Sequence, residues 1–245
     1  MKISNQTVLI TGAAQGLGLA IAKAFAKEKA KLILIDKKPD ELDKIKFDNC
    51  QKYVVDLNIR EETKGLINEL KKNSFVIDTL IHNASILVPT PFIHTTEKIW
   101  DQTMKVTLES GFLLSKYVWE DMSSNKDGVI IFVSSKAGLE GFENETAYCA
   151  AKHGLEGLMK SLAIEGMKNK IQVFTITPGM LINTPMSESN YTAEFKKKWV
   201  DPIEVTPAFL KLSSRRYKQM SGQHVNAWDF SKTTDTKKCT KFLNI

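Results

Sequence analysis

The chain has 245 residues, of which 42% are hydrophobic, enough for one sizeable core and typical of a single α/β domain. Its three cysteines, Cys50, Cys149 and Cys239, show neither the spacing of a metal site nor a disulfide framework, so we expect a reducing compartment and no metal. No apolar run is long enough for a signal peptide or a membrane span, and we expect a cytoplasmic protein with no membrane partner.

The basic excess does not by itself indicate nucleic-acid binding. The formal net charge is +6, but all except three of the 34 basic residues are lysines, and they are spread along the chain. Arginine, with its planar guanidinium, binds bases and phosphates better than lysine does. We therefore expect a lysine-rich, solvated surface and no nucleic-acid partner.

The chain opens with a predicted strand, a glycine-rich turn and a helix. Residues 7–10 form a short apolar run, and from Leu17 to Phe25 apolar residues recur at helical spacing. Glycines at such a junction let the backbone approach a pyrophosphate, which the helix N-terminus attracts. The turn supplies five expected cofactor-binding residues: Gly12, Gln15, Gly16, Leu17 and Gly18.

A second predicted strand, residues 31–36, ends in Asp36, about twenty residues beyond the glycines. At that distance a carboxylate can bind the ribose 2′-OH of NAD, and it would repel the 2′-phosphate of NADP. Lys37 and Lys38 follow at once and could soften this preference. The alternative is a surface aspartate at a strand end.

Strands and helices alternate along the rest of the chain. This pattern predicts a parallel sheet with helices on both faces, and a site at the carboxyl ends of the strands. Further strands are expected at 52–57, 77–81, 128–133 and 171–176, and helices at 61–72, at 96–119 and around Tyr148.

Tyr148 and Lys152 are four residues apart, so on a helix they share one face. An ammonium beside a phenol stabilises the phenolate, which lowers the pKa of the tyrosine and suits it to proton transfer. Alone this spacing is weak evidence for a catalytic pair, because such pairs are common on solvated helices.

Taken together, the motifs resemble the short-chain dehydrogenase/reductase family over roughly residues 5–185. The resemblance implies a Rossmann-like, doubly wound, mostly parallel seven-stranded sheet and an NAD(P)(H)-dependent oxidoreductase. The matching features, in the family's order, are Thr11-Gly12-x-x-x-Gly16-x-Gly18, Asp56-Leu57, Asn83-Ala84, Ser135, Tyr148-x-x-x-Lys152 and Pro178-Gly179.

The family's roles carry over to these positions. Tyr148 would be the general acid/base, Lys152 would lower its pKa and bind the nicotinamide ribose, and Ser135 would hold the substrate oxygen. Asp36 would bind the adenosine ribose and Asp56 the adenine, although Asp56 could instead cap a strand end. The other implied cofactor contacts are Leu57, Asn83, Ala84, Pro178, Gly179 and Thr184.

Four departures from the family pattern stand out. Thr107 occupies the position of the family's active-site asparagine, which is implicated in a proton relay, and we count it among the catalytic candidates. Ser85 replaces a glycine and His82 an asparagine; His82 could contact solvent or cofactor, but a structural role is favoured. The run after Pro178 is one residue longer than usual, so either Thr184 or Asn183 would reach the cofactor. The last predicted strand, near 221–227, lacks the usual glycine pair after it.

We expect one oxidoreductase domain over residues 1–230, a substrate cap at about 183–201 and a polar, lysine-bearing tail at 231–245. Lysines 196–198 could attract an anionic substrate, but a solvated helix face is favoured. The acids of the loop 139–143 would disfavour an anion if they point inward, so the substrate is left open. The resemblance also implies a homo-oligomer, a dimer or tetramer.

The sequence thus predicts an enzyme that interconverts a secondary alcohol and a carbonyl compound, with NAD(H) preferred and NADP(H) as the second option. A scaffold or regulator that binds the cofactor with little turnover is the alternative. Thr107 and the altered glycine positions favour the scaffold, and the intact Ser135, Tyr148 and Lys152 favour the enzyme.

Overall fold

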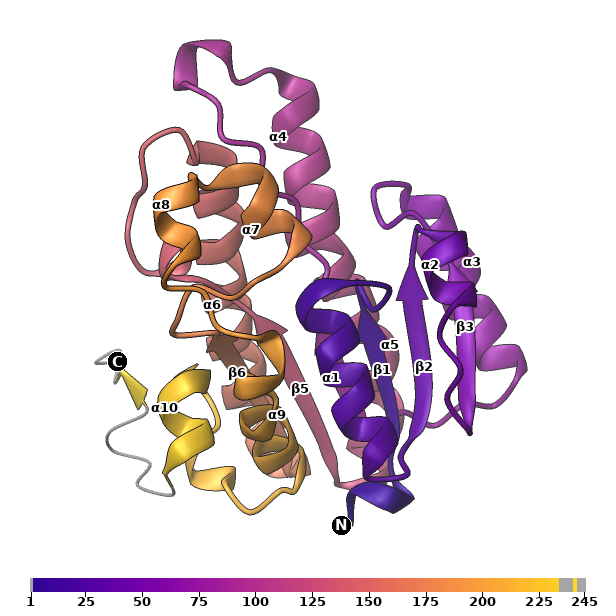
Figure 1. Ribbon diagram of the computed structural model, residues 1–245. Coiled ribbons are helices and arrows are strands. Elements are labelled where there is room, and N and C mark those ends of the chain that lie inside the picture. The colour runs from indigo at the N-terminus through magenta and orange to yellow at the C-terminus, as the bar shows by residue number, and fades with distance from the viewer. Residues whose placement is uncertain (1, 234–239, 242–245) are drawn as a thin grey trace.

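The computed structural model describes residues 2–233 and 240–241. One sheet runs through the molecule in the order β3-β2-β1-β4-β5-β6-β7-β8, as Figure 1 shows for most of its strands. The first seven strands are parallel, and the short β8 is antiparallel to β7. The strands are β1 (Thr7–Thr11), β2 (Lys31–Asp36), β3 (Cys50–Val54), β4 (Thr79–His82), β5 (Gly128–Val133), β6 (Ile171–Thr177), β7 (His224–Asn226) and β8 (Thr240–Lys241).

Helices cover both faces of the sheet, so the predicted Rossmann-like, doubly wound fold is confirmed. One face carries α1 (Gly16–Lys27), α2 (Pro39–Asp43), α9 (Thr206–Ser213) and α10 (Ala227–Lys232). The other carries α3 (Arg60–Lys72), α5 (Ser110–Asn125) and α6 (Thr146–Gly166). Beyond the carboxyl edge lie α4 (Glu97–Met104), α7 (Pro185–Asn190) and α8 (Ala193–Lys196), at the top of Figure 1.

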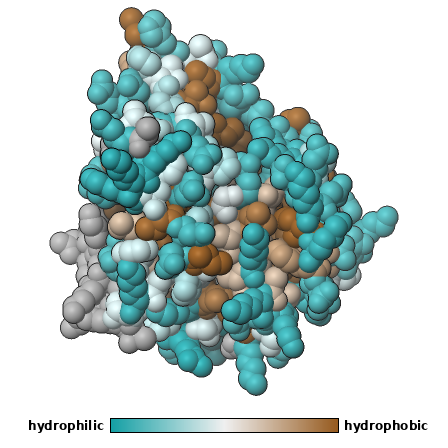
Figure 2. Space-filling model, in the orientation of Figure 1, coloured by the Kyte–Doolittle hydropathy of each residue, from teal (hydrophilic) through white to brown (hydrophobic). Residues whose placement is uncertain are grey.

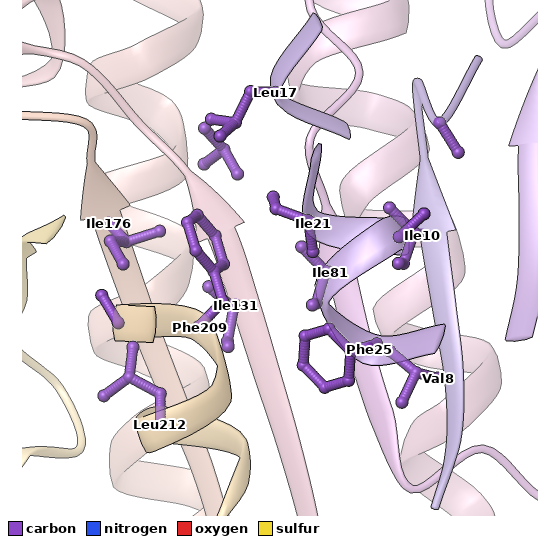
Figure 3. Close-up of a cluster of buried hydrophobic side chains, with 14 of the residues drawn as sticks. Val8, Ile10, Leu17, Ile21, Phe25, Ile81, Ile131, Ile176, Phe209 and Leu212 are labelled. Carbon is purple, nitrogen blue, oxygen red and sulfur yellow. The ribbon is translucent and has the colours of Figure 1, made fainter. Parts of the chain in front are cut away.

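Apolar runs in the strands explain this layering. In β1, Val8 and Ile10 pack on one face of the sheet, whereas Leu9 between them packs on the other. A strand that is buried on both faces needs such a continuous apolar run. Figure 3 shows Leu17, Ile21 and Phe25 of α1, and Phe209 and Leu212 of α9, with apolar side chains of the strands.

Short turns connect these elements. A π-helical turn, η3 (Lys105–Glu109), interrupts the helix expected at 96–119 and separates α4 from α5. The remaining short turns are the 3₁₀ segments η1 (Ile3–Asn5), η2 (Phe92–His94), η4 (Lys136–Gly138), η5 (Met167–Asn169), η6 (Pro202–Val205) and η7 (Lys218–Met220).

Three predicted boundaries were wrong. The third strand is Cys50–Val54 rather than 52–57, because the chain turns at Asp56, whose carboxylate accepts a hydrogen bond from the Asn58 amide at 2.9 Å. The fourth strand is Thr79–His82, with Asp78 before it accepting a bond from the Thr7 amide. The last strand ends at Asn226, because that side chain caps α10.

Beyond residue 230, α10 continues to Lys232 and β8 pairs with β7; residues 234–239 and 242–245 of the expected tail lie outside the described residues. Figure 2 shows mostly hydrophilic side chains on one face of the molecule, with hydrophobic residues grouped near its middle. No helix in the described part of the chain has the length and apolar character needed to cross a bilayer.

Candidate active site

A cavity of about 990 Å³ opens at the carboxyl edge of the sheet. Here β1 and β4 are neighbours although two strands separate them in the chain, which is the position where open α/β sheets bind their ligands. Most of the predicted site residues line this one cavity: Gly12, Gln15, Gly16, Leu17, Asp36, Asp56, Leu57, Asn83, Ala84, Ser135, Tyr148, Lys152, Pro178, Gly179 and Thr184. Gly18 and Thr107 do not line it.

The glycine-rich turn has the backbone that its sequence predicts. Gly12 and Gly16 have φ of +64° and +55°, which side chains rarely adopt. A Cβ on Gly12 would lie 3.0 Å from the Ala84 Cα. Gly18 serves packing instead, because a Cβ there would collide with the Gly12 carbonyl. Gly12 and Gly16 both line the cavity, so their backbone, which carries no side chains, forms a cradle that faces it beside the start of α1.

Asp36 is fixed at the end of β2. Its carboxylate accepts hydrogen bonds from the amides of Ala14 at 3.0 Å and Lys38 at 3.2 Å. The Lys38 ammonium donates to the Gln15 side chain at 2.6 Å, so a cation stands beside the same stretch of the cavity. Asp56 caps a turn, and it also lines the cavity.

Three consecutive residues at the end of β5 face three successive turns of α6. Ser135 hydrogen-bonds to the Tyr148 side chain, the Val133 carbonyl accepts from the Lys152 ammonium at 2.6 Å, and Ser134 donates to Glu156 at 2.5 Å. The helix residues are spaced by four, which keeps them on one face. This β5–α6 ladder places the predicted Ser–Tyr–Lys group on one wall of the cavity.

The pKa of Tyr148 differs from the expectation. Burial raises it above the ordinary value, and the nearby Tyr191 and Glu145 raise it further, while hydrogen bonds with Ser135 and Ser85 oppose the rise. Lys152 Nζ lies 5.3 Å from the centroid of the Tyr148 ring. Burial also lowers the pKa of Lys152 to about 7, against the charge of Glu156. In this structure Tyr148 is a phenol ready to donate a proton rather than a phenolate.

Two of the departures from the family pattern lie in contact with each other. The hydroxyls of Ser85 and Thr107 are 3.1 Å apart, and Thr107 also accepts a bond from the Ile86 amide. Ser85 lines the cavity and hydrogen-bonds to Tyr148, whereas Thr107 is fully buried behind it. Sequence reasoning missed Ser85 as a site residue, although its replacement of a glycine was the available signal.

His82 is structural in this fold. The Thr11 hydroxyl oxygen accepts from the amides of Asn83 and Ala84, so its hydrogen is available to His82 Nδ1, 3.0 Å away. His82 Nε2 then donates to the Thr107 carbonyl at 3.0 Å. Burial lowers the pKa of His82 to about 4, in keeping with a neutral ring. His82 thus ties β4 to the π turn.

Thr184, rather than Asn183, reaches the cavity. It is almost fully buried, lines the cavity near Gly16, and caps α7 by accepting a bond from the Ser187 amide at 3.1 Å. Asn183 pairs through its backbone with Val200 and lies outside the cavity wall.

The sheet order, the glycine-rich turn at the crossover and the Ser–Tyr–Lys wall define a class of Rossmann-fold oxidoreductases. The family model described as short chain dehydrogenase matches residues 6–194. The chain belongs to the short chain dehydrogenase family.

Among curated relatives, Oxidoreductase UcpA of Escherichia coli (strain K12) is 34% identical over 195 residues, covering 77% of this chain and 73% of the relative. The 3-oxoacyl-[acyl-carrier-protein] reductase FabG of Rickettsia bellii (strain RML369-C) is 30% identical over 238 residues, or 92% and 97% of the two chains. A solved 4-hydroxyisoleucine dehydrogenase complexed with NADH has a TM-score of 0.84 at 27% identity, covering 91% of this chain and 98% of that chain.

Proposed function

We propose that this protein interconverts a secondary alcohol and a carbonyl compound with a nicotinamide dinucleotide, and that Tyr148 is its general acid/base. The observation that carries the proposal is the shared cavity: the glycine cradle at Gly12 and Gly16 opens into the space lined by Ser135, Tyr148 and Lys152. An anion-binding turn and a proton donor within one cavity suit a reaction that moves a hydride and a proton together.

The residues present fit such a cofactor. Gly12 and Gly16 line the cavity without side chains, and Asp36 lines the same cavity with its carboxylate already oriented. When bound, the nicotinamide supplies or accepts the hydride. Gly12, Gly16 and the start of α1 would hold the pyrophosphate, Asp36 the adenosine ribose, and Lys152 and Thr184 the nicotinamide half.

In carbonyl reduction, Tyr148 gives its hydroxyl proton to the oxygen of the substrate as the carbon gains the hydride. Ser135 donates a hydrogen bond to that oxygen while negative charge develops on it. The ammonium of Lys152 stabilises the phenolate left on Tyr148. In alcohol oxidation the same groups act in reverse, and Tyr148 accepts the proton.

NAD(H) is the proposed preferred cofactor, with NADP(H) possible. The fixed carboxylate of Asp36 favours a free 2′-OH and opposes a 2′-phosphate, and Lys37 and Lys38 beside it reduce that opposition. The 4-hydroxyisoleucine dehydrogenase complexed with NADH is a structural relative in which this cofactor is bound.

The substrate end of the cavity supports a mainly apolar compound. Leu87, Leu139, Phe142 and Met186 line the cavity, together with Glu145 and Lys198. Glu145 is half-buried and its charge acts on Tyr148, so a carboxylate or phosphate close to the reacting carbon would be repelled. The acids Glu140 and Glu143 are exposed and do not line the cavity.

The test is to mix the purified protein with NADH or NADPH and a broad panel of ketones and aldehydes, and to follow oxidation of the reduced cofactor. We expect turnover of ketones and faster turnover with NADH. Tight cofactor binding without turnover across the panel would favour the scaffold instead. Absence of cofactor binding would contradict both functions.

A further inference from the structure

A buried carboxylate lies directly behind the Tyr148–Lys152 pair, and the proposed reaction leaves it without a role. Glu156 is one helical turn beyond Lys152 on α6, and its exposure is 4%. Its oxygens contact three polar side chains: Ser134 at 2.5 Å, Thr175 at 2.7 Å and His224 at 2.9 Å. Ser134 directly follows β5, and Thr175 and His224 lie in β6 and β7, so one carboxylate joins α6 to the region of three neighbouring strands.

Burying a carboxylate costs free energy unless hydrogen-bond partners satisfy its oxygens. Burial by itself would raise the pKa of Glu156, but hydrogen bonds and charge from His224, with the hydroxyls of Ser134 and Thr175, hold it below the ordinary value. Glu156 is therefore a carboxylate at neutral pH. A fixed negative charge of this kind, out of reach of solvent screening, acts strongly on its neighbours.

The neighbour on which it acts is Lys152. Lys152 is 2% exposed, and its amine donates to the Val133 carbonyl rather than to a carboxylate. Burial lowers the pKa of Lys152, and Glu156 is the charged group that opposes this effect. The other titratable groups facing Lys152 are Tyr148 on α6 and the neutral His82 on β4, and neither supplies a negative charge at neutral pH.

Glu156 also fixes geometry. Ser134 lies between Val133, which contacts Lys152, and Ser135, which contacts Tyr148. A bond from Ser134 to Glu156 therefore sets the register of α6 against the end of β5. Space there is tight, because a Cβ on Gly138 would come within 2.7 Å of the Ser134 hydroxyl and 3.3 Å of Glu156 Cγ.

We propose that Glu156, anchored by Ser134, Thr175 and His224, is a positioning residue that holds α6 in register with β5 and keeps an ammonium at Lys152. The catalytic part of this inference rests on the proposed function. The effect of the Glu156 charge on Lys152 does not depend on that function.

The first test compares Glu156→Gln with Glu165→Gln. Both remove one charge from α6, but Glu165 is exposed. The rate of carbonyl reduction, kcat/KM, should fall as pH rises through the pKa of Lys152. In Glu156→Gln that fall should begin about one pH unit lower, with about a fivefold loss at neutral pH. Glu165→Gln should leave the profile in place. A uniform loss at every pH in Glu156→Gln would indicate a merely structural role and overturn the proposal.

The second test needs no substrate. Because the pKa of Lys152 is lower in the folded than in the unfolded protein, the unfolded state binds more protons between the two values, and stability rises with pH across that window. Urea unfolding from pH 5 to 10, with and without Lys152→Met, isolates this part of the pH dependence. In Glu156→Gln the rise should begin about one pH unit lower. An unchanged onset would overturn the proposal, whereas a shifted onset in a protein without turnover would contradict the proposed function alone.

Discussion

The two walls of the cavity are built differently. The β5–α6 wall is held by the bonds of Lys152 and Glu156 to three strands, and both side chains are almost completely buried. The cap wall, residues 183–201, is held by backbone bonds from Asn183 to Val200 and from Val200 to Leu181, and by Asn190, which donates to the Leu87 carbonyl at 3.4 Å. From this difference we expect the proposed chemistry to depend on a rigid element and the choice of substrate on an adaptable one.

The largest effect is expected on the rigid wall. Tyr148→Phe removes the proton donor and should lower kcat by about 10²–10⁴-fold, as expected for the loss of a general acid. Cofactor affinity, measured by NADH fluorescence, should change little. Tyr53→Phe, which alters a tyrosine outside the cavity, is the control. Near-normal turnover in Tyr148→Phe would contradict its role.

The second-largest effect is expected on the choice between NADH and NADPH. Asp36→Asn keeps an acceptor for the Ala14 amide but removes the charge. The ratio of the NADPH and NADH dissociation constants should shift towards NADPH by about tenfold, or ~1.4 kcal/mol. Asp40→Asn, an exposed neighbour outside the cavity, should leave the ratio unchanged. An equal change for both cofactors would show that Asp36 does not select between them.

The Ser85–Thr107 contact offers a sharper test of the rigid wall. Ser85→Gly removes one hydrogen bond to Tyr148 and should lower kcat by about two- to tenfold, the range for a single bond. Thr107→Asn alone should be at least as harmful, because the longer side chain meets Ser85. The double variant should recover part of the loss, which a double-mutant cycle measures. Strictly additive effects would mean that the two replacements are independent.

The smallest effect is expected at the substrate end of the cavity. Glu145→Gln should lower KM for ketones that carry a carboxylate by about threefold, since a half-buried charge is partly screened. Glu143→Gln, exposed and outside the cavity, is the matched control. No difference between the two variants would place the substrate away from Glu145.

Local patterns were enough to predict the strand–turn–helix opening and the sheet. Apolar runs define β1, β2, β5 and β6, and Gly12 and Gly16 adopt the positive φ that such a turn needs. The strand ends were less well predicted, because the turn at Asp56 depends on a side-chain bond that periodicity does not report.

The polar contacts behind the site could not be predicted in the same way. In the sequence, Glu156 looks like any other charged residue of a helix, and its hydrogen-bond partner His224 lies 68 positions away. Ser85 and Thr107 are 22 residues apart and meet only because β4 ends beside the π turn. Both contacts depend on how distant elements pack, which a single sequence does not encode as a spacing.

The π turn between α4 and α5 has a consequence for insertions and deletions. Each residue of an α-helix advances the chain by 100°. A π turn holds about one residue more than an α turn, so removing one residue between Lys105 and Glu109 would allow a continuous α-helix in which α4 and α5 keep nearly the same faces and only the residues of the turn change direction. Thr107 would then turn from Ser85. At this point the number of residues is as strongly constrained as their identity.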